Sequence, residues 1–363
     1  MGIYSNKLFY LSIFFVLIVN FVIFYVLVFW ANTDITTHAR FISAYIENKI
    51  FPPNFLYYLT VAIGALFSSN YIHILYSSIM VLSIAVTAKY FFTVKCVIAW
   101  LNINHKEESI EYRIVFYISF ALLFIFCLPF LGQHWYLGQF PPNVWHNSTV
   151  IFLMPVALLT FYYSCEFLEH GNANLLYKIT GLIILGLFIK PSFYMSFSIV
   201  FPCFCLYYYG ASKKLIYSLI PVISGGCVLL LQYYIIYIFQ DFDKINIQVM
   251  QEIQGQNFKL PSEDSGVSFG WLDVWNKYSI DIPLSILNSL LLPLLILTGY
   301  PKECFFNKRF QFSAALQVIS LLLFSIFYET GRRSGDGKFL WQNIITNYIL
   351  HLVVIIVFYS NKK

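Results

Sequence analysis

Charged residues are scarce in this chain. Only 11% of its 363 residues are Asp, Glu, Lys or Arg, whereas 59% are hydrophobic. Because a soluble domain keeps a larger charged surface in contact with water, this composition and the mean hydropathy of +0.71 exclude an ordinary soluble protein. The net charge of +5 is small and spread over short stretches, so we expect no binding of nucleic acid.

Motifs of soluble catalysis and of metal binding are also missing. The chain contains no P-loop and no GxGxxG, GxSxG or HExxH pattern, which disfavours a nucleotide-driven reaction. Its 7 cysteines include no pair at metal-ligand spacing, so we predict neither a disulfide nor a zinc site. The acidic residues of 240–279 match no compact calcium or magnesium motif. We therefore expect no required cofactor, and a divalent metal ion has no motif to support it.

What the chain does have is a series of long apolar runs. A helix needs about 20 apolar residues to cross the hydrocarbon core. We therefore predict an all-α polytopic membrane protein, a single domain over residues 1–363, with about 10 (range about 10 to 12) transmembrane helices. The predicted helices cover residues 8–30, 72–101, 113–131, 147–167, 175–190, 192–209, 215–239, 280–299, 311–328 and 341–359.

Loop charges predict the orientation, because cytoplasmic loops carry most Lys and Arg. The apolar segment 55–68 is only about half a spanning length, so it could be a span, a re-entrant hairpin or an interfacial helix. Treating it as non-spanning places Lys7, Lys213, Lys214, Lys308 and Arg309 on one side. We therefore expect cytoplasmic N and C termini in a bacterial inner or plasma membrane. Loops at about 31–71, 132–146, 240–279 and 329–340 then lie outside, the first with interfacial helices.

The first external loop offers a candidate general base. Asp34 follows the aromatic end of the first predicted helix, and His38 lies four residues later, on the same face of any helix that starts there. A carboxylate at the membrane surface can accept a proton from a substrate hydroxyl. Alternatively, Asp34 or Thr33 caps an interfacial helix.

The second external loop has no Lys or Arg but is dense in aromatic and amide side chains. These groups suit stacking on sugar faces and hydrogen bonding to hydroxyls. The alternative is an aromatic belt with Asn147 or Ser148 as a helix cap. With His38, the predicted sugar or acceptor contacts are His134, Trp135, Asn143, Trp145, His146 and Asn147.

The last external loop carries cations against the usual charge rule. Arg332, Arg333 and Lys338 stand among glycines there, and arginine is well suited to phosphate. Lys190, between two predicted helices, could reach the same phosphate. The alternatives are contacts of the loop with lipid headgroups and snorkelling of Lys190 to the interface.

Two stretches resemble the polytopic glycosyltransferases of the C superfamily (GT-C). One is 34–60, an acid after the first helix followed by His, Arg and Pro-Pro; the other is Asn143-Val144-Trp145-His146-Asn147-Ser148-Thr149. The resemblance implies inverting transfer of a sugar from a polyprenyl-phosphate donor to a glycan or lipid-linked acceptor outside the cell, with the donor supplied by a partner enzyme and a flippase. It implies Asp34 as the base and Arg332, Arg333 and Lys338 as phosphate ligands. Such sites often have a second nearby carboxylate, whereas the nearest here is Glu47, which argues against a metal-dependent mechanism.

Two other function classes remain open. A surface polysaccharide polymerase or ligase of the O-antigen type would make Arg332 or Arg333 essential and Asp34 dispensable. A lipid-linked glycan flippase or transporter would need ionisable residues deep within its helices. We expect almost none there, with Asn20 and Gln232 as isolated polar exceptions.

Overall fold

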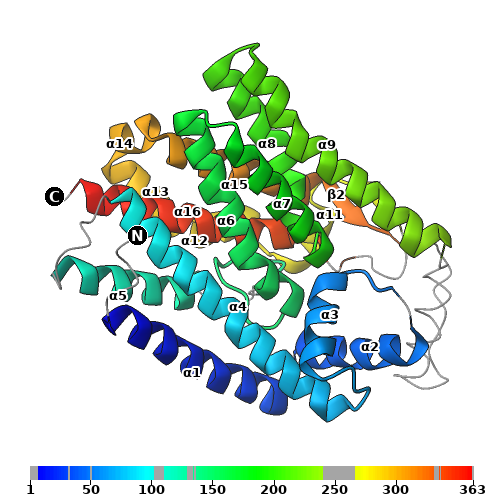
Figure 1. Cartoon of the computed structure of the whole chain (residues 1–363). Helices are drawn as coiled ribbons and strands as arrows, with labels where there is room; N and C mark the ends of the chain where they lie inside the picture. Colours follow the sequence, from blue (N-terminus) through cyan, green and yellow to red (C-terminus); the bar gives the residue numbers. More distant parts are fainter. Residues whose placement is uncertain are drawn as a thin grey trace.

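The computed structural model describes residues 7–31, 33–49, 51–101, 110–128, 134, 136–239, 266–330, 335 and 337–361. Over these residues the fold is all-α apart from one two-stranded antiparallel ribbon, in which Val267 pairs with Glu329 (Figure 1). The elements are α1 (Lys7–Trp30), α2 (Asp34–Asn48), α3 (Phe55–Gly64), α4 (Tyr71–Trp100), α5 (Ile110–Phe124), α6 (Ser148–His170), α7 (Asn174–Ile189), α8 (Ser192–Tyr209), α9 (Lys213–Tyr233) with a π-helical turn (Tyr234–Phe239), β1 (Val267–Phe269), α11 (Asp273–Tyr278), α12 (Ile282–Ser289), α13 (Leu291–Gly299), α14 (Pro301–Phe306), α15 (Lys308–Ile326), β2 (Phe327–Glu329) and α16 (Leu340–Ser360).

The protein is a polytopic helical membrane protein. In the described part of the chain, six helices are long and apolar enough to cross a membrane, namely α1, α4, α6, α9, α15 and α16. The bent pair α12 and α13 makes a seventh if it counts as one span. The predicted number of about ten is not confirmed, because helices such as α7, with 16 residues, reach only about 24 Å and the hydrocarbon core is about 30 Å thick.

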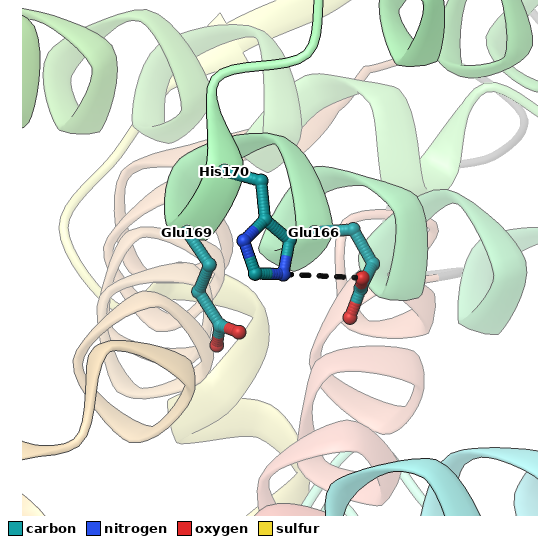
Figure 2. Close-up of side chains that lie close together, drawn as sticks. All are labelled: Glu166, Glu169 and His170. Carbon is teal, nitrogen blue, oxygen red and sulfur yellow. Dashed lines mark ion pairs between the residues drawn. The ribbon is translucent and has the colours of Figure 1, made fainter.

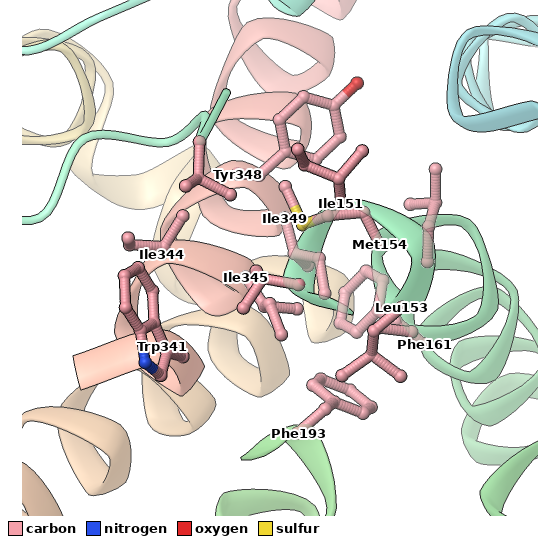
Figure 3. Close-up of a cluster of buried hydrophobic side chains, with 14 of the residues drawn as sticks. Ile151, Leu153, Met154, Phe161, Phe193, Trp341, Ile344, Ile345, Tyr348 and Ile349 are labelled. Carbon is pink, nitrogen blue, oxygen red and sulfur yellow. The ribbon is translucent and has the colours of Figure 1, made fainter. Parts of the chain in front are cut away.

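Helix α16 forms the centre of the core. Its Ile344, Ile345 and Tyr348 belong to one buried cluster with Ile151 and Met154 of α6 (Figure 3). The outer helix α1 is apolar on all sides, yet buries only a stripe that includes Phe9, Val16, Phe24 and Val28. Apolar side chains on both faces suit a helix with protein on one side and lipid on the other.

A proline divides the predicted helix 280–299 into α12 and α13, which meet at an angle of 69°. Pro293 has no N–H to donate to the carbonyl of Ser289, and its ring would clash with that carbonyl in a continuous helix. Asn347 of α16 donates its Nδ2 to this carbonyl instead, at 3.1 Å, and to the carbonyl of Phe140 at 2.7 Å. The break is therefore tied to the central helix by a side-chain amide.

The first loop folds as two short helices beside α4 (Figure 1). Helix α2 is amphipathic, with Ile35, Ala39, Ile42 and Tyr45 buried at helical spacing. Helix α3 has ten residues, so its length of about 15 Å is too short to cross the membrane. The structure thus gives no full membrane span within 55–64.

One further predicted helix ends earlier than expected. The helix predicted to reach residue 131 ends as α5 at Phe124. Asn143 donates its Nδ2 to the carbonyls of Leu122 and Ile125 at this end, at 2.9 and 2.8 Å. The helix predicted over 215–239 is α9 followed by the π-helical turn.

Candidate functional site

A cavity of about 690 Å³ lies where α2, the start of α6, the junction of α7 and α8, the end of β2 and the start of α16 meet. It brings together residues from all three polar stretches singled out in the sequence. The predicted site residues that line it are Asp34, His38, His146, Asn147, Lys190 and Lys338.

Asp34 is exposed at the first position of α2. Thr33 occupies the N-cap position, and its side chain makes no capping hydrogen bond. The Asp34 carboxylate accepts a hydrogen bond from Nδ2 of Asn147 at 3.5 Å. Helix α2 also places His38 one turn along, on the cavity wall, so the acid and the imidazole share one face as the spacing predicted.

Asn147 acts both as a helix cap and as part of the cavity wall. Its Oδ1 accepts from the backbone N–H of Val150 at 3.2 Å and thereby caps α6. The same oxygen accepts from Nζ of Lys190 at 3.3 Å, while Nδ2 faces Asp34. One carboxamide therefore contacts an acid on one side and an ammonium group on the other.

Lys190 points into the cavity because of the residue that follows it. Pro191 disfavours helical backbone at the preceding position, and Lys190 accordingly ends α7 with extended backbone. Its Nζ donates to Oγ1 of Thr149 at 3.1 Å and lies 5.1 Å from the centre of the Trp341 ring. These contacts hold the ammonium group against the cavity wall.

Two histidines complete the wall. Nδ1 of His38 lies 2.6 Å from the hydroxyl of Tyr58. The ring of His146 packs edge-on against Tyr136 at 4.3 Å and against Trp341 at 5.7 Å. Burial lowers the pKa of His146 below its usual 6.5; the Asp34 carboxylate opposes this shift and the Lys190 ammonium adds to it. His146 therefore offers a neutral imidazole at physiological pH.

Lys338 is paired with Glu329 on the same wall. The carboxylate belongs to the last residue of β2, and the lysine lies two positions before α16. Tyr278, which also lines the cavity, donates its hydroxyl to the carbonyl of Gly335 at 3.0 Å. The wall at Lys338 thus carries a cation and an anion together.

Three predicted sugar contacts lie away from the cavity. Asn143 is buried and bonded to α4 and α5, and Trp145 packs between Phe24 and Phe124. The ring of His134 packs against Tyr278, behind the wall. The remaining predicted site residues, Trp135, Arg332 and Arg333, lie outside the described residues.

The expectation that the spans hold almost no ionisable group is wrong. Lys89, in the middle of α4, is only 5% exposed, and its Nζ lies 4.4 Å from the centre of the Tyr348 ring. His351 of α16 is equally buried, and its Nδ1 lies 2.8 Å from the carbonyl of Asn347. Both residues were visible in the sequence as polar positions within apolar runs, which is a signal of function or of specific packing.

Sequence reasoning also missed a second hollow next to the cavity. A groove of about 200 Å³ between α2 and α3 is lined mainly by apolar side chains, among them Ile42, Ile46 and Leu59. Tyr45 and Tyr58 line both the groove and the cavity. The polar cavity therefore continues into an apolar groove between α2 and α3.

A cluster of possible metal ligands lies at the other end of α6, where Glu166, Glu169 and His170 share the last turn (Figure 2). Both carboxylate oxygens of Glu169 are occupied by Arg309 of α15, at 2.7 and 2.8 Å. His170 forms an ion pair with Glu166 at 3.7 Å when protonated. The cluster is explained by helix packing, and we assign it no metal.

Compared with models of protein families, with curated proteins and with solved structures, the chain matches none of them. The arrangement of its own side chains is therefore the basis for a function. That arrangement is a polar cavity with Asp34 and Lys190 on its wall, beside an apolar groove, in a polytopic helical membrane protein.

Proposed function

We propose that the protein is a membrane glycosyltransferase that moves a sugar from a polyprenyl-phosphate donor to a glycan or lipid-linked acceptor. One observation carries the proposal: Asp34 and Lys190 contact opposite ends of the Asn147 carboxamide in one cavity. A carboxylate can accept the proton of an attacking hydroxyl, and an ammonium group can neutralise a departing phosphate. A displacement reaction at a sugar carbon needs both groups.

In the proposed reaction the acceptor oxygen attacks the anomeric carbon of the sugar, and the hydroxyl proton passes to Asp34. The bond between that carbon and the phosphate oxygen breaks, and polyprenyl phosphate leaves with the electron pair. Attack opposite the leaving group inverts the configuration. Lys190 stabilises the charge that develops on the phosphate, and the aromatic rings of Tyr136 and Trp341 offer faces on which a sugar can stack.

The apolar groove supports a lipid-linked donor. Because Tyr45 and Tyr58 belong to both hollows, an isoprenoid chain lying in the groove can place its phosphate in the cavity. Exposed apolar side chains follow α3, including Leu66 at 88% exposure, as expected for a segment in contact with lipid.

The proposal includes a GT-C-like architecture in a cell membrane. Helices α5, α7 and α8 would then supply the crossings beyond the six or seven candidate spans, giving about ten. The cavity would face the extracytoplasmic side and both termini the cytoplasm, in keeping with the loop charges. Arg332 and Arg333 would add further cations to the phosphate site. A partner enzyme would make the polyprenyl-phosphate sugar, and a flippase would bring it to the cavity.

A surface polysaccharide polymerase or ligase is the second candidate, and it would depend on Arg332 or Arg333 more than on Asp34. A flippase or transporter is the third. The buried Lys89 and His351 favour this third candidate more than the sequence suggested.

Deleting the gene and comparing the surface glycans by mass spectrometry tests the function class. Loss of a single sugar branch supports a transferase, and shortened chains support a polymerase. An unchanged glycan contradicts both. The purified protein in lipid nanodiscs, supplied with polyprenyl-phosphate sugars, should then release polyprenyl phosphate only when an acceptor is present.

A further inference from the structure

The ion pair of Glu329 and Lys338 joins two separately anchored parts of the backbone. Glu329 ends β2, where the ribbon pairs it with Val267. Lys338 belongs to the turn that enters α16, in which Leu340 N–H donates to the carbonyl of Gly337 at 2.8 Å. Since the ribbon and the turn hold the two backbones, the side chains can part without unfolding either element.

Lys338 and Lys190 both lie next to Trp341. The backbone N–H of Trp341 donates to the carbonyl of Lys338 at 3.4 Å, and the Lys190 ammonium lies 5.1 Å from the indole ring. Both lysines and Glu329 line the same cavity. An anionic group bound near Trp341 therefore meets two ammonium groups on the same cavity wall, those of Lys190 and Lys338. The second of these is paired with the Glu329 carboxylate.

We propose that the Glu329 carboxylate is an internal substitute for the ligand's phosphate, and that a bound phosphate displaces it from Lys338. A phosphate group carries more acceptor oxygens than a carboxylate, and an ammonium group has three donors. The side chain of Lys338 is 36% exposed and that of Glu329 is 12% exposed, so the lysine is open to a ligand while its partner sits on the inner side. The pair is only partly buried, so its exchange costs less than that of a fully buried ion pair.

The inference rests on the proposed function for the class of ligand, which is a phosphate ester of a lipid. It adds a specific role for Glu329: the acid keeps Lys338 in place in the empty cavity and weakens binding by competing with phosphate. No covalent step is involved.

Titrations with the full-length protein in neutral phosphatidylcholine nanodiscs test this exchange. The probes are a polyprenyl monophosphate and, separately, inorganic phosphate, and binding is read from tryptophan fluorescence. Glu329→Gln should strengthen binding of the lipid phosphate by about fivefold, and Lys338→Gln should weaken it by a similar factor. The double variant should bind like Lys338→Gln, because the competitor matters only when the lysine is present.

Glu303→Gln is the matched control, since Glu303 is an exposed acid of α14 outside the cavity lining and its loss changes the net charge equally. The exchange is contradicted if Glu329→Gln binds no more tightly than Glu303→Gln, or if the double variant keeps the gain. Equal gains for both probes identify the phosphate alone as the ligand, whereas a gain only for the lipid shows that the chain is needed. Tighter binding without any sugar transfer would support the exchange and refute the glycosyltransferase; transfer without tighter binding would do the reverse.

Discussion

The Lys89 ammonium group, in the candidate membrane span α4, donates a 2.5 Å hydrogen bond to Oδ1 of Asn143. Asn143 in turn donates to two carbonyls at the end of α5, and its own carbonyl accepts from Tyr136. The segment that carries His146 and Asn147 to the cavity is therefore tied to α4 by Lys89 and to the end of α5 by the Asn143 carboxamide.

Lys89→Met should loosen this segment. It leaves Oδ1 of Asn143 buried without its donor, at a cost of about 1–3 kcal/mol. Thermal unfolding in detergent checks the cost. Lys95→Met is the control, because Lys95 lies on the same helix, is only half-buried and approaches the ring of Phe91. Equal losses for the two variants would contradict a specific role for Lys89.

Asp34→Asn should abolish sugar transfer. An amide cannot take up the acceptor proton, and removal of a general base costs about 10² to 10⁴ in rate. Because Asp34 is exposed and its hydrogen bond with Asn147 is long, the variant should fold and insert normally. Turnover and thermal unfolding are measured together. Activity retained within about tenfold would assign the base elsewhere.

Lys190→Gln should slow transfer by about 10² or more, because the leaving phosphate loses a cation that neutralises its developing charge. Lys190→Arg should keep part of the rate, as it keeps the charge but not the geometry toward Thr149. Single-turnover rates with saturating donor separate this effect from weaker binding. A transport function would instead predict loss of substrate movement with no product formed.

Acid should destabilise the protein through His146. Its pKa is lowered in the folded state, so the unfolded chain binds a proton more readily once the pH falls below about 6.5. Stability is complete above that pH and declines as the pH falls toward the lowered value. His146→Gln should therefore show a smaller drop in melting temperature between pH 7.5 and 5.5. An identical drop in the variant would mean that other groups control the acid response.

Asn347→Leu should destabilise the bend between α12 and α13. The substitution removes the donor from the carbonyls of Ser289 and Phe140, at a cost of about 1–3 kcal/mol for each buried acceptor. Pro293→Ala restores a backbone N–H that can reach Ser289. The double variant should therefore lose less than the sum of the two single losses. Strict additivity in unfolding experiments would show that the proline and the amide act independently.

The sequence pattern predicted the helical membrane class and part of the cavity. Asp34 and His38 lie on one helical face as their spacing required, and Asn147 caps α6 while also reaching the cavity. Apolar length alone did not reveal where a helix bends or stops. At the bend near Pro293, the carbonyl of Ser289 accepts a hydrogen bond from Asn347 of α16, which is far away in the sequence. A local sequence pattern does not contain such a contact.

The amino-acid composition of the polar loop before α6 does not show which of its residues line the cavity and which pack in the core. Asn143 and Asn147 are the same residue type four positions apart, yet one is buried against Lys89 and the other contacts Asp34. Trp145, between them, packs on Phe24 and Phe124. Only the tertiary fold decides which amide faces the cavity.

The cap of α6 also determines which end of the Asn147 carboxamide faces Asp34 and which end faces Lys190. The helix N-terminus requires the oxygen of Asn147, so only the NH₂ group remains for Asp34, and the oxygen side is the one that meets Lys190. Asp in this position would still cap the helix but would set one carboxylate against another. The geometry of a helix start thus dictates on which side of the Asn147 carboxamide the carboxylate and the ammonium group lie.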